Sequence, residues 1–197
     1  MTRLEIATEK ERLRRKILGL RDQQTSNELK NKSSKITEAV LGLPEYRKSK
    51  VVACYVDKGS EVKTRPLIRK VLAARKKVLV PIVDKESQNL LYSEIGDLDE
   101  LTPGAFGILE PKLEHRKLTD LATANVVFVP GIAWDFGGYR LGWGKGYFDL
   151  VLKRLPDKLT SIGLAFDLQV VERVPRAQFD LPVDILVTES RVVHCHG

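Results

Sequence analysis

Residues 125–155, NVVFVPGIAWDFGGYRLGWGKGYFDLVLKRL, place a glycine-rich stretch between an apolar run and a helical one. The run NVVFVP is typical of a buried strand, and YFDLVLKRL repeats its apolar residues at helical spacing. Because glycine has no Cβ, backbone N–H groups near it can approach a bound anion closely, and Arg140 and Lys145 add full charges. We therefore expect a phosphate-binding loop that opens a helix. Its glycines are Gly137, Gly138, Gly142, Gly144 and Gly146.

The spacing matches neither of two well-known phosphate loops. A Walker loop needs a glycine five positions before its Gly-Lys pair and a Ser or Thr after the lysine, but Tyr139 and Gly146 stand there. The dinucleotide fingerprint needs a third glycine where the chain has Asp149. A plain glycine-rich turn is the alternative. Arg140, Lys145 and Asp149 together favour a nucleotide–metal site over that alternative.

Composition is typical of a one-domain globular protein. The 197 residues are 43% hydrophobic and 30% charged, which suits a single buried core. No apolar segment has the length of a signal peptide or membrane span, and Cys54 and Cys195 predict reduced thiols, so we expect a cytoplasmic protein. Much of the net charge of +7 lies in the first fifty residues. It indicates either a solvated helix face or a surface that attracts polyanions.

The first 43 residues predict a helical segment that packs on the rest of the domain. Leu13, Ile17 and Leu20 form an apolar stripe. Thr25 or Ser26, with Glu28, is typical of the start of a second helix. That helix buries Leu29, Ile36, Val40 and Leu43, and ends at Pro44.

Beyond Pro44, strands and helices alternate. Near-continuous apolar strands between helices predict an α/β fold, a single three-layer domain with a mostly parallel sheet. In such folds ligands bind at the carboxyl ends of the strands, which here lead into the segments after VVACYV, NVVFVP and TSIGLA. The expected strands are 51–56, 77–83, 89–95, 125–130, 160–166 and 184–190, and the expected helices are 64–77 and 147–155.

Charged residues outside the glycine-rich stretch allow two interpretations each. Lys10 and Arg14 share one helix face, and they either reach the phosphates of a nucleotide or form an ordinary solvated face. Glu61 follows a strand and either accepts hydrogen bonds from ligand N–H groups or precedes a helix that Thr64 caps.

Asp149 and Asp184 are the candidate Mg²⁺ ligands, because Mg²⁺ takes a few carboxylates plus water and substrate phosphates. Asp135 is expected to shape a loop. Of Tyr147 and Phe148, one ring is expected to close over a flat ligand and the other to pack in the core. Trp134 and Trp143 add aromatic density near the glycines. His194-Cys195-His196 is expected to be an unstructured tail.

Several motifs in one order resemble the 5-formyltetrahydrofolate cyclo-ligase (methenyltetrahydrofolate synthetase) family. The string GYRLGWGKGYFD resembles the family hallmark Arg-Leu-Gly-x-Gly-x-Gly-Tyr-Tyr-Asp. The likeness covers nearly the whole chain, at Lys10–Arg14, Glu61–Thr64, Gly107–Pro111, Gly163–Gln169 and Pro182–Glu189. It implies a fold similar to the sugar-phosphate isomerase and CoA-transferase group.

The resemblance also implies roles for individual residues. Arg140, Lys145 and Tyr147 would be catalytic, Asp149 and Asp184 would bind Mg²⁺, and Val56, Glu61 and Trp143–Tyr147 would contact the folate. ATP would be held by Lys10, Arg14, Arg140, Leu141, Gly142, Trp143, Gly144, Lys145, Gly146, Tyr147 and Phe148. Two departures are Phe148, where the hallmark has a second tyrosine, and Phe179-Asp180, where the family commonly has His-Asp.

The implied activity is the ATP- and Mg²⁺-dependent conversion of 5-formyltetrahydrofolate to 5,10-methenyltetrahydrofolate, ADP and phosphate. ATP would phosphorylate the formyl oxygen, and N10 would then attack the activated carbon. We expect a monomer with no membrane or nucleic-acid partner, whose basic surface attracts a polyglutamate tail. Two alternatives stay open: a paralogue that acts on another small molecule, and a basic nucleic-acid-binding module.

Overall fold

Apolar runs form the central sheet of the molecule. The computed structural model describes residues 2–177 and 180–195. Across the sheet the strand order is β12 (Val192–His194), β11 (Ile185–Val187), β9 (Thr160–Leu164), β6 (Val126–Val129), β1 (Val51–Cys54), β2 (Lys77–Asp84) and β3 (Asn89–Ile95). The five strands from β11 to β2 pair in parallel, and the edge strands β3 and β12 pair antiparallel, which confirms the mostly parallel sheet.

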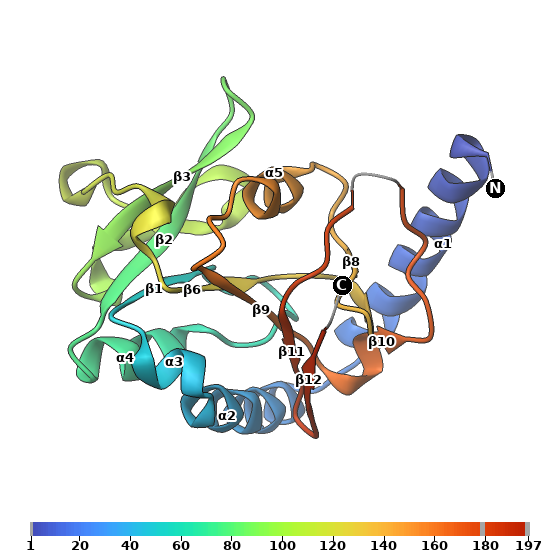
Figure 1. Cartoon of the computed structure of the whole chain (residues 1–197), viewed down its shortest axis with the longest axis horizontal. Helices are drawn as coiled ribbons and strands as arrows, with labels where there is room; N and C mark the ends of the chain where they lie inside the picture. The colour runs from blue at the N-terminus through green and yellow to red at the C-terminus, as the bar shows by residue number, and fades with distance from the viewer. Residues whose placement is uncertain (1, 178–179, 196–197) are drawn as a thin grey trace.

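Helices cover both faces of this sheet (Figure 1). On one face lie α2 (Ser26–Gly42), α3 (Pro44–Lys48) and α4 (Arg65–Ala73), and on the other lies α5 (Tyr147–Lys153). The core on the first face includes Val40 and Ile68, and the core on the second includes Val151 and Leu152. The three-layer α/β architecture is therefore confirmed.

The second helix begins where the capping signal predicts. The Thr25 hydroxyl accepts from the Glu28 backbone N–H at 3.2 Å, and the Glu28 carboxylate accepts from the Thr25 backbone N–H at 2.8 Å. This reciprocal pair satisfies two backbone donors at the helix start. The helix buries the expected apolar residues, and the chain restarts at Pro44 as the short α3. The buried residues are Leu29, Ile36, Val40 and Leu43.

The first helix, α1 (Arg3–Asp22), lies at the end of the sheet beside a second, small sheet (Figure 1). That sheet has the order β10 (Val170–Val171), β7 (Ala133–Asp135) and β8 (Arg140–Leu141). Ile17 is buried against it and Leu13 packs beside Ile17. Leu20 was expected in the same stripe, but its side chain is exposed. The stripe continues four residues on from Ile17, at the buried Arg21.

Shorter elements complete the chain. Two strands, β4 (Leu101–Pro103) and β5 (Leu109–Pro111), form a hairpin from the turn-rich segment. The expectation of an unstructured tail at His194-Cys195-His196 is wrong up to residue 195, because β12 pairs with β11. His196 lies outside the described residues. Cys54 and Cys195 are buried free thiols. The single-turn 3-10 helices are η1 (Leu98–Glu100), η2 (Ala105–Gly107), η3 (Leu113–His115), η4 (Leu121–Thr123) and η5 (Asp167–Gln169).

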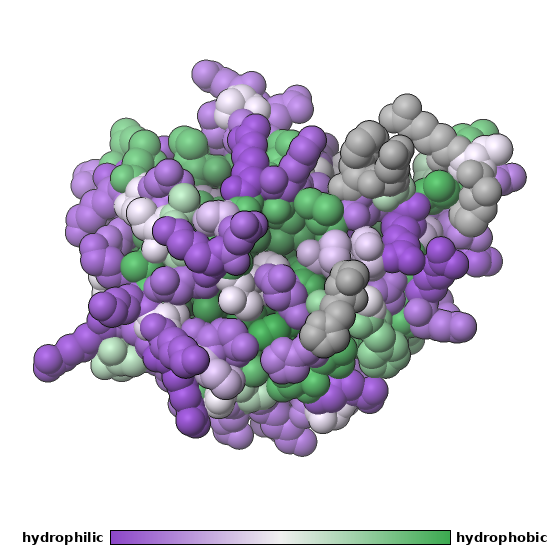
Figure 2. Space-filling model, viewed as in Figure 1, coloured by the Kyte–Doolittle hydropathy of each residue, from purple (hydrophilic) through white to green (hydrophobic). Residues whose placement is uncertain are grey.

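Hydrophilic side chains dominate the face seen in Figure 2, with apolar side chains visible between them near the centre. Among the described residues, no helix is both long enough and apolar enough to cross a membrane.

Candidate active site at the carboxyl edge of the sheet

Three neighbouring parallel strands, β9, β6 and β1, end at the same edge of the sheet. The segments that follow them are therefore brought together, as expected for this fold class. Gln169, in the segment after β9, ties two of them, because its side-chain amide donates to the carbonyl oxygens of Gly131 and Ile132, both at 2.9 Å. Through these two hydrogen bonds, the Gly163–Gln169 motif holds the start of the glycine-rich stretch in place.

The glycine-rich stretch begins with a β-hairpin that the sequence pattern did not predict. β7 and β8 pair antiparallel, and Asp135 shapes their turn by accepting from the N–H groups of Gly137 at 3.0 Å and Tyr139 at 3.2 Å. Gly138 has a left-handed φ of 81°, and a Cβ there would lie 2.6 Å from the Val183 carbonyl oxygen. Gly137 and Gly138 therefore build the turn, and the expected five-glycine cradle is corrected to three glycines.

Trp134 is a core residue and adds nothing to the aromatic surface of the loop. Its side chain is fully buried. A Cβ on Gly131 or Gly163 would lie within 2.6 Å of its ring, so both positions need glycine for the indole to fit. Trp143, in contrast, is 58% exposed within the loop.

The loop itself is residues 142–146, between β8 and α5. Gly144 and Gly146 have left-handed φ values of 86° and 74°, which glycine adopts at little cost. A Cβ at Gly142 or Gly146 would meet nothing within 4 Å, so the main chain here faces open space. Lys145 is exposed between them. The loop therefore offers accessible main chain and one exposed cation to an anion.

Helix α1 brings Arg14 to this loop and places Lys10 against Asp180, so neither side chain lies on a fully solvated face. The Arg14 side chain is 16% exposed, and its Nε donates to the Gly142 carbonyl oxygen at 3.1 Å. The Lys10 ammonium is 2.5 Å from a carboxylate oxygen of Asp180. Arg14 therefore contacts the loop, and Lys10 lies one helical turn earlier on α1, although each is more than a hundred residues from its partner in sequence.

Arg140 is buried beneath the loop and forms an ion pair with Asp149. Its NH2 group is 2.6 Å from Oδ1 of Asp149, and NH1 donates to the Leu181 carbonyl oxygen at 3.4 Å. Burial lowers the pKa of the Arg140 guanidinium, while the charges of Asp149 and Asp180 oppose that change. An arginine stays charged even so, and the pair links β8 to the first turn of α5.

The two candidate metal ligands have different surroundings. The Asp149 side chain is 46% exposed directly after the loop. Asp184 lies at the amino ends of β9 and β11, where Oδ2 accepts from the backbone N–H and hydroxyl of Ser161, both at 2.7 Å. Within residues 2–177 and 180–195, no three His, Cys, Asp or Glu side chains form a metal-binding group. Asp149 fits a Mg²⁺ ion that takes its other ligands from phosphates and water.

Glu61 and Val56 lie in the segment between β1 and α4. Val56 is buried in the core, so only its main chain is available to a ligand. Thr64 does not cap α4, because its hydroxyl donates to the Tyr55 carbonyl oxygen at 2.7 Å. Oε2 of Glu61 accepts from the Lys58 backbone N–H at 2.9 Å. Burial raises the pKa of the Glu61 carboxyl, while the Lys58 N–H and the charge of Arg21 act in the opposite direction.

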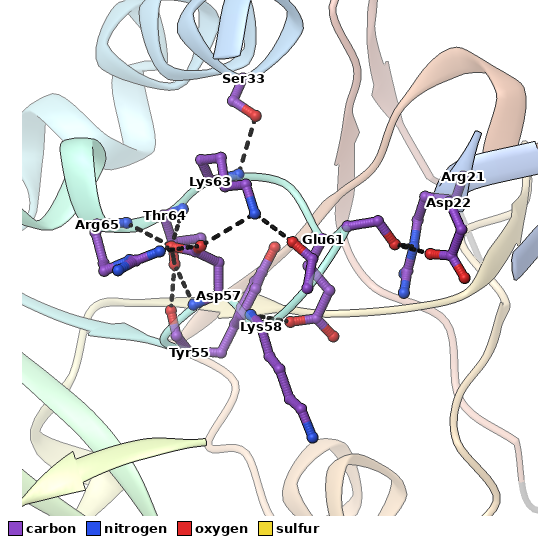
Figure 3. Close-up of polar contacts among 12 residues, drawn as sticks. Arg21, Asp22, Ser33, Tyr55, Asp57, Lys58, Glu61, Lys63, Thr64 and Arg65 are labelled. Atoms are coloured by element: carbon purple, nitrogen blue, oxygen red, sulfur yellow. Dashed lines mark hydrogen bonds and ion pairs between the residues drawn. The ribbon is translucent and has the colours of Figure 1, made fainter. Parts of the chain in front are cut away.

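Sequence reasoning missed two charged residues in this region, Asp57 and Arg21. Figure 3 shows Asp57 at the centre of a hydrogen-bond cluster. Its carboxylate accepts from the Thr64 backbone N–H at 3.0 Å, and from the Arg65 backbone N–H and guanidinium at 3.1–3.2 Å. Its place three residues after the end of β1 was the available signal for Asp57. For Arg21, the only available signal was its helical spacing from Leu13 and Ile17.

Tyr147 and Phe148 are both half-buried, and the role of one ring in closing over a flat ligand stays a prediction. Phe148 packs against the apolar cores on both faces of the sheet. Tyr147 lines a cavity of about 240 Å³ between β3 and α5, together with Tyr92 and Arg154. The cavity is smaller than a typical ligand pocket.

Comparisons with known proteins show which family the chain belongs to. The model of the 5-formyltetrahydrofolate cyclo-ligase family matches residues 6–189. The 5-formyltetrahydrofolate cyclo-ligase of Haemophilus influenzae is 31% identical over 188 residues, 94% of this chain and 97% of that relative. The Escherichia coli enzyme of the same name is 35% identical over 143 residues, 72% and 79% of the two chains. The chain belongs to the 5-formyltetrahydrofolate cyclo-ligase family, and it is an enzyme of the ligase class.

Solved structures support the fold of this cyclo-ligase family member. The 5,10-methenyltetrahydrofolate synthetase of Aquifex aeolicus superposes with a TM-score of 0.84 at 38% identity, covering 95% of this chain and 93% of that chain. The synthetase of Mycoplasma pneumoniae, at 20% identity and a TM-score of 0.74, shares the fold.

The two positions at which this chain departs from the family pattern, Phe148 and Phe179-Asp180, have different structural surroundings. Phe148 uses its ring for core packing, which needs no hydroxyl. Phe179 lies outside the described residues, while Asp180 accepts from Lys10 and from the Ala177 backbone N–H at 2.8 Å.

Proposed function

We propose that the protein converts 5-formyltetrahydrofolate to 5,10-methenyltetrahydrofolate, with ATP and Mg²⁺. The observation that carries this proposal is the open loop 142–146. Cations from α1, β8 and the loop itself surround it, and Glu61 lies nearby on the same edge of the sheet. An anion site beside a semi-buried carboxylate suits a nucleotide and a heterocycle that offers N–H donors.

The chemistry needs positioning and neutralisation of charge. The γ-phosphoryl group moves to the formyl oxygen and ADP leaves. The lone pair of N10 then attacks the formyl carbon, N10 loses its proton, and the C–O bond breaks as inorganic phosphate departs. The oxygen of the formyl group therefore ends in the phosphate. Such a reaction requires no protein nucleophile, because phosphoryl transfer depends mainly on alignment and electrostatic stabilisation.

The charged residues around the loop have complementary roles in this proposal. Lys145 and the main chain of residues 142–146 hold the phosphates, and Lys145 and Arg140 offset the charge that develops during transfer. Lys10 and Arg14 bind the nucleotide from α1. Lys10 exchanges its contact with Asp180 for a phosphate oxygen when the nucleotide binds.

The folate side of the site uses different groups. Glu61 accepts hydrogen bonds from the N–H groups of the pterin, while Tyr147 and Trp143 orient its flat ring system. Val56 contributes main-chain contacts. Asp149 holds Mg²⁺ together with nucleotide phosphates, and Asp184 as a second ligand stays a prediction. Bound Mg²⁺ would neutralise phosphate charge.

A polyglutamate tail has a basic surface available on α1. A hollow of about 370 Å³ lies between this helix and residues 173–175, and its cations are Arg12, Lys16 and Arg173. We propose that it attracts the carboxylates of the tail, and that the protein acts as a cytoplasmic monomer.

Absorbance of the methenyl product tests the proposal directly. Purified protein with ATP, Mg²⁺ and 5-formyltetrahydrofolate should develop that absorbance, and omission of any one component should abolish it. With substrate labelled by ¹⁸O in the formyl group, the label should appear in inorganic phosphate. Nucleotide binding without product would favour a paralogue on another small molecule. Salt-sensitive binding of nucleic acid that ATP does not displace would favour the nucleic-acid module.

A further inference from the structure

Arg21 is the most deeply buried cation of α1 among residues 4–22. It lies in the last turn of the helix and only 2% of its surface is exposed. A cation favours the carboxyl end of a helix, but an exposed side chain would serve that purpose as well. Burial of a guanidinium requires specific partners to offset its desolvation. The partners of Arg21 therefore indicate what the residue does.

The first partner is the segment that carries Glu61. Nε of Arg21 donates to the Ser60 hydroxyl oxygen at 3.0 Å, and the Ser60 hydroxyl donates in turn to a carboxylate oxygen of Asp22. Figure 3 shows Arg21 and Asp22 side by side at the end of α1, facing this segment. The end of the helix thus holds the residue directly before Glu61.

The other end of the segment is fixed independently by the Asp57 cluster. Between the two anchors, Gly59 has a left-handed φ of 55°, and the Glu61 backbone N–H donates to the Lys58 carbonyl oxygen at 3.1 Å. Removal of the Arg21 contact would therefore free only the part of the segment that places the Glu61 carboxylate.

Arg21 also contacts the glycine-rich loop. Its guanidinium carbon lies 5.9 Å from the ring centre of Trp143, within the range of a cation–π interaction. One cation thus touches both segments to which the family resemblance assigns folate contacts. Arg14 and Arg21 are seven residues apart, which corresponds to about 10 Å along a helix. A single rigid helix therefore connects the nucleotide side of the site to the folate side.

We propose that Arg21 is a positioning residue that anchors the Glu61 segment to α1 and so sets the affinity for the folate substrate. This inference rests on the proposed function and adds a residue to it.

The electrostatic setting of Glu61 provides a readout that a purely structural role would not change. Burial raises the pKa of Glu61, and the positive charge of Arg21 counteracts it. Loss of that charge should move the acid limb of kcat/KM for the folate to higher pH. The groups that face Glu61 are Arg21 from α1, Trp143 from the loop, and Tyr55, Asp57 and Lys58 from its own segment.

Steady-state kinetics of three variants test the inference. Arg21→Gln should raise the KM for 5-formyltetrahydrofolate about tenfold, change the KM for ATP less than about twofold, and shift the acid limb to higher pH. Arg21→Lys keeps the charge but loses the planar donor, so the acid limb should stay in place while KM rises. Arg15→Gln is the matched control, because that exposed arginine is on the same helix.

Ser60→Ala keeps the proposal testable if Arg21→Gln folds poorly. It should raise the folate KM by a smaller factor, without shifting the acid limb. Where Arg21→Gln folds, adding Ser60→Ala to it should cause little further change. An unchanged folate KM in either folded variant, or equal increases in both KM values, would overturn the inference. Wild-type protein that makes no methenyl product would instead overturn the proposed function.

Discussion

Lys145 is the exposed cation of the loop 142–146. Its replacement should impair turnover without affecting the fold. Lys145→Ala should lower kcat/KM about 100-fold, because the transferring phosphoryl group loses a cation, while the melting temperature stays unchanged. Lys158→Ala, at an exposed lysine after α5, is the control. Near-normal turnover with unchanged ATP affinity would show that the loop does not hold the phosphates.

In the proposed site, Asp149 is the residue that would bind Mg²⁺. Asp149→Asn keeps the shape of the side chain but removes its charge, so the Mg²⁺ concentration for half-maximal turnover should rise about tenfold. Titration of Mg²⁺ at saturating ATP and folate measures this change, and Asp157→Asn serves as an exposed control. An unchanged Mg²⁺ requirement would remove Asp149 from the metal site.

For single residues, the sequence indicated the kind of chemistry better than it indicated where each side chain lies in the fold. The spacing of Lys10 and Arg14 on a helix left two interpretations, because the contacts that separate them lie more than a hundred residues away. Arg21 was missed for a local reason. Leu20 is three residues from Ile17 and Arg21 is four, and the buried stripe continues with the arginine.

The segment between β1 and α4 depends on Asp57. Asp57→Asn should lower the free energy of unfolding by about 2 kcal/mol at neutral pH, because a buried charged acceptor of several hydrogen bonds is lost. Burial would raise the pKa of Asp57, but the hydrogen bonds and charge of Arg65, with Lys63, outweigh it and lower the pKa below 3.8.

The lowered pKa of Asp57 determines how the stability of the protein depends on pH. Ionised Asp57 stabilises the fold above pH 3.8, and that contribution is lost as the pH falls through the lowered pKa. The stability difference between wild type and Asp57→Asn should therefore shrink in acid. Urea unfolding across this pH range measures it, with Asp99→Asn as an exposed control. A difference that is constant with pH would contradict the role given to the Asp57 charge.

Elements were predicted well where their pattern is local. The capping signal at Thr25 or Ser26, with Glu28, placed the start of α2 to within one residue. The hairpin of β7 and β8 was missed because its strands have three and two residues, too short for a periodic pattern. β12 was missed because its order comes from pairing with β11.

For the whole molecule, the strand–helix alternation was enough to predict the parallel sheet and the edge where the site lies. It could not give the directions of β3 and β12, since an edge strand can pair either way. Placement of α1 was also beyond the pattern, because its docking on the small sheet depends on contacts distant in sequence.

Nucleotide binding should stabilise the whole domain. At ATP and Mg²⁺ concentrations about 100 times the dissociation constant, the gain is about 2.7 kcal/mol. For a chain of this size, the melting temperature should rise by roughly 5–10 °C. Thermal unfolding with and without the ligands measures the shift, which should be reduced in Lys145→Ala. No shift with ATP, but one with duplex DNA, would favour the nucleic-acid alternative.

The central claim is that the main chain of residues 142–146, together with cations from α1 and β8, binds the triphosphate. A crystal structure with a non-hydrolysable ATP analogue and Mg²⁺ tests it most directly. We predict phosphate oxygens on the backbone N–H groups of this loop, contacts from Lys10, Arg14 and Lys145, and the metal beside Asp149. A triphosphate bound in another part of the molecule, with this loop empty, would contradict the account.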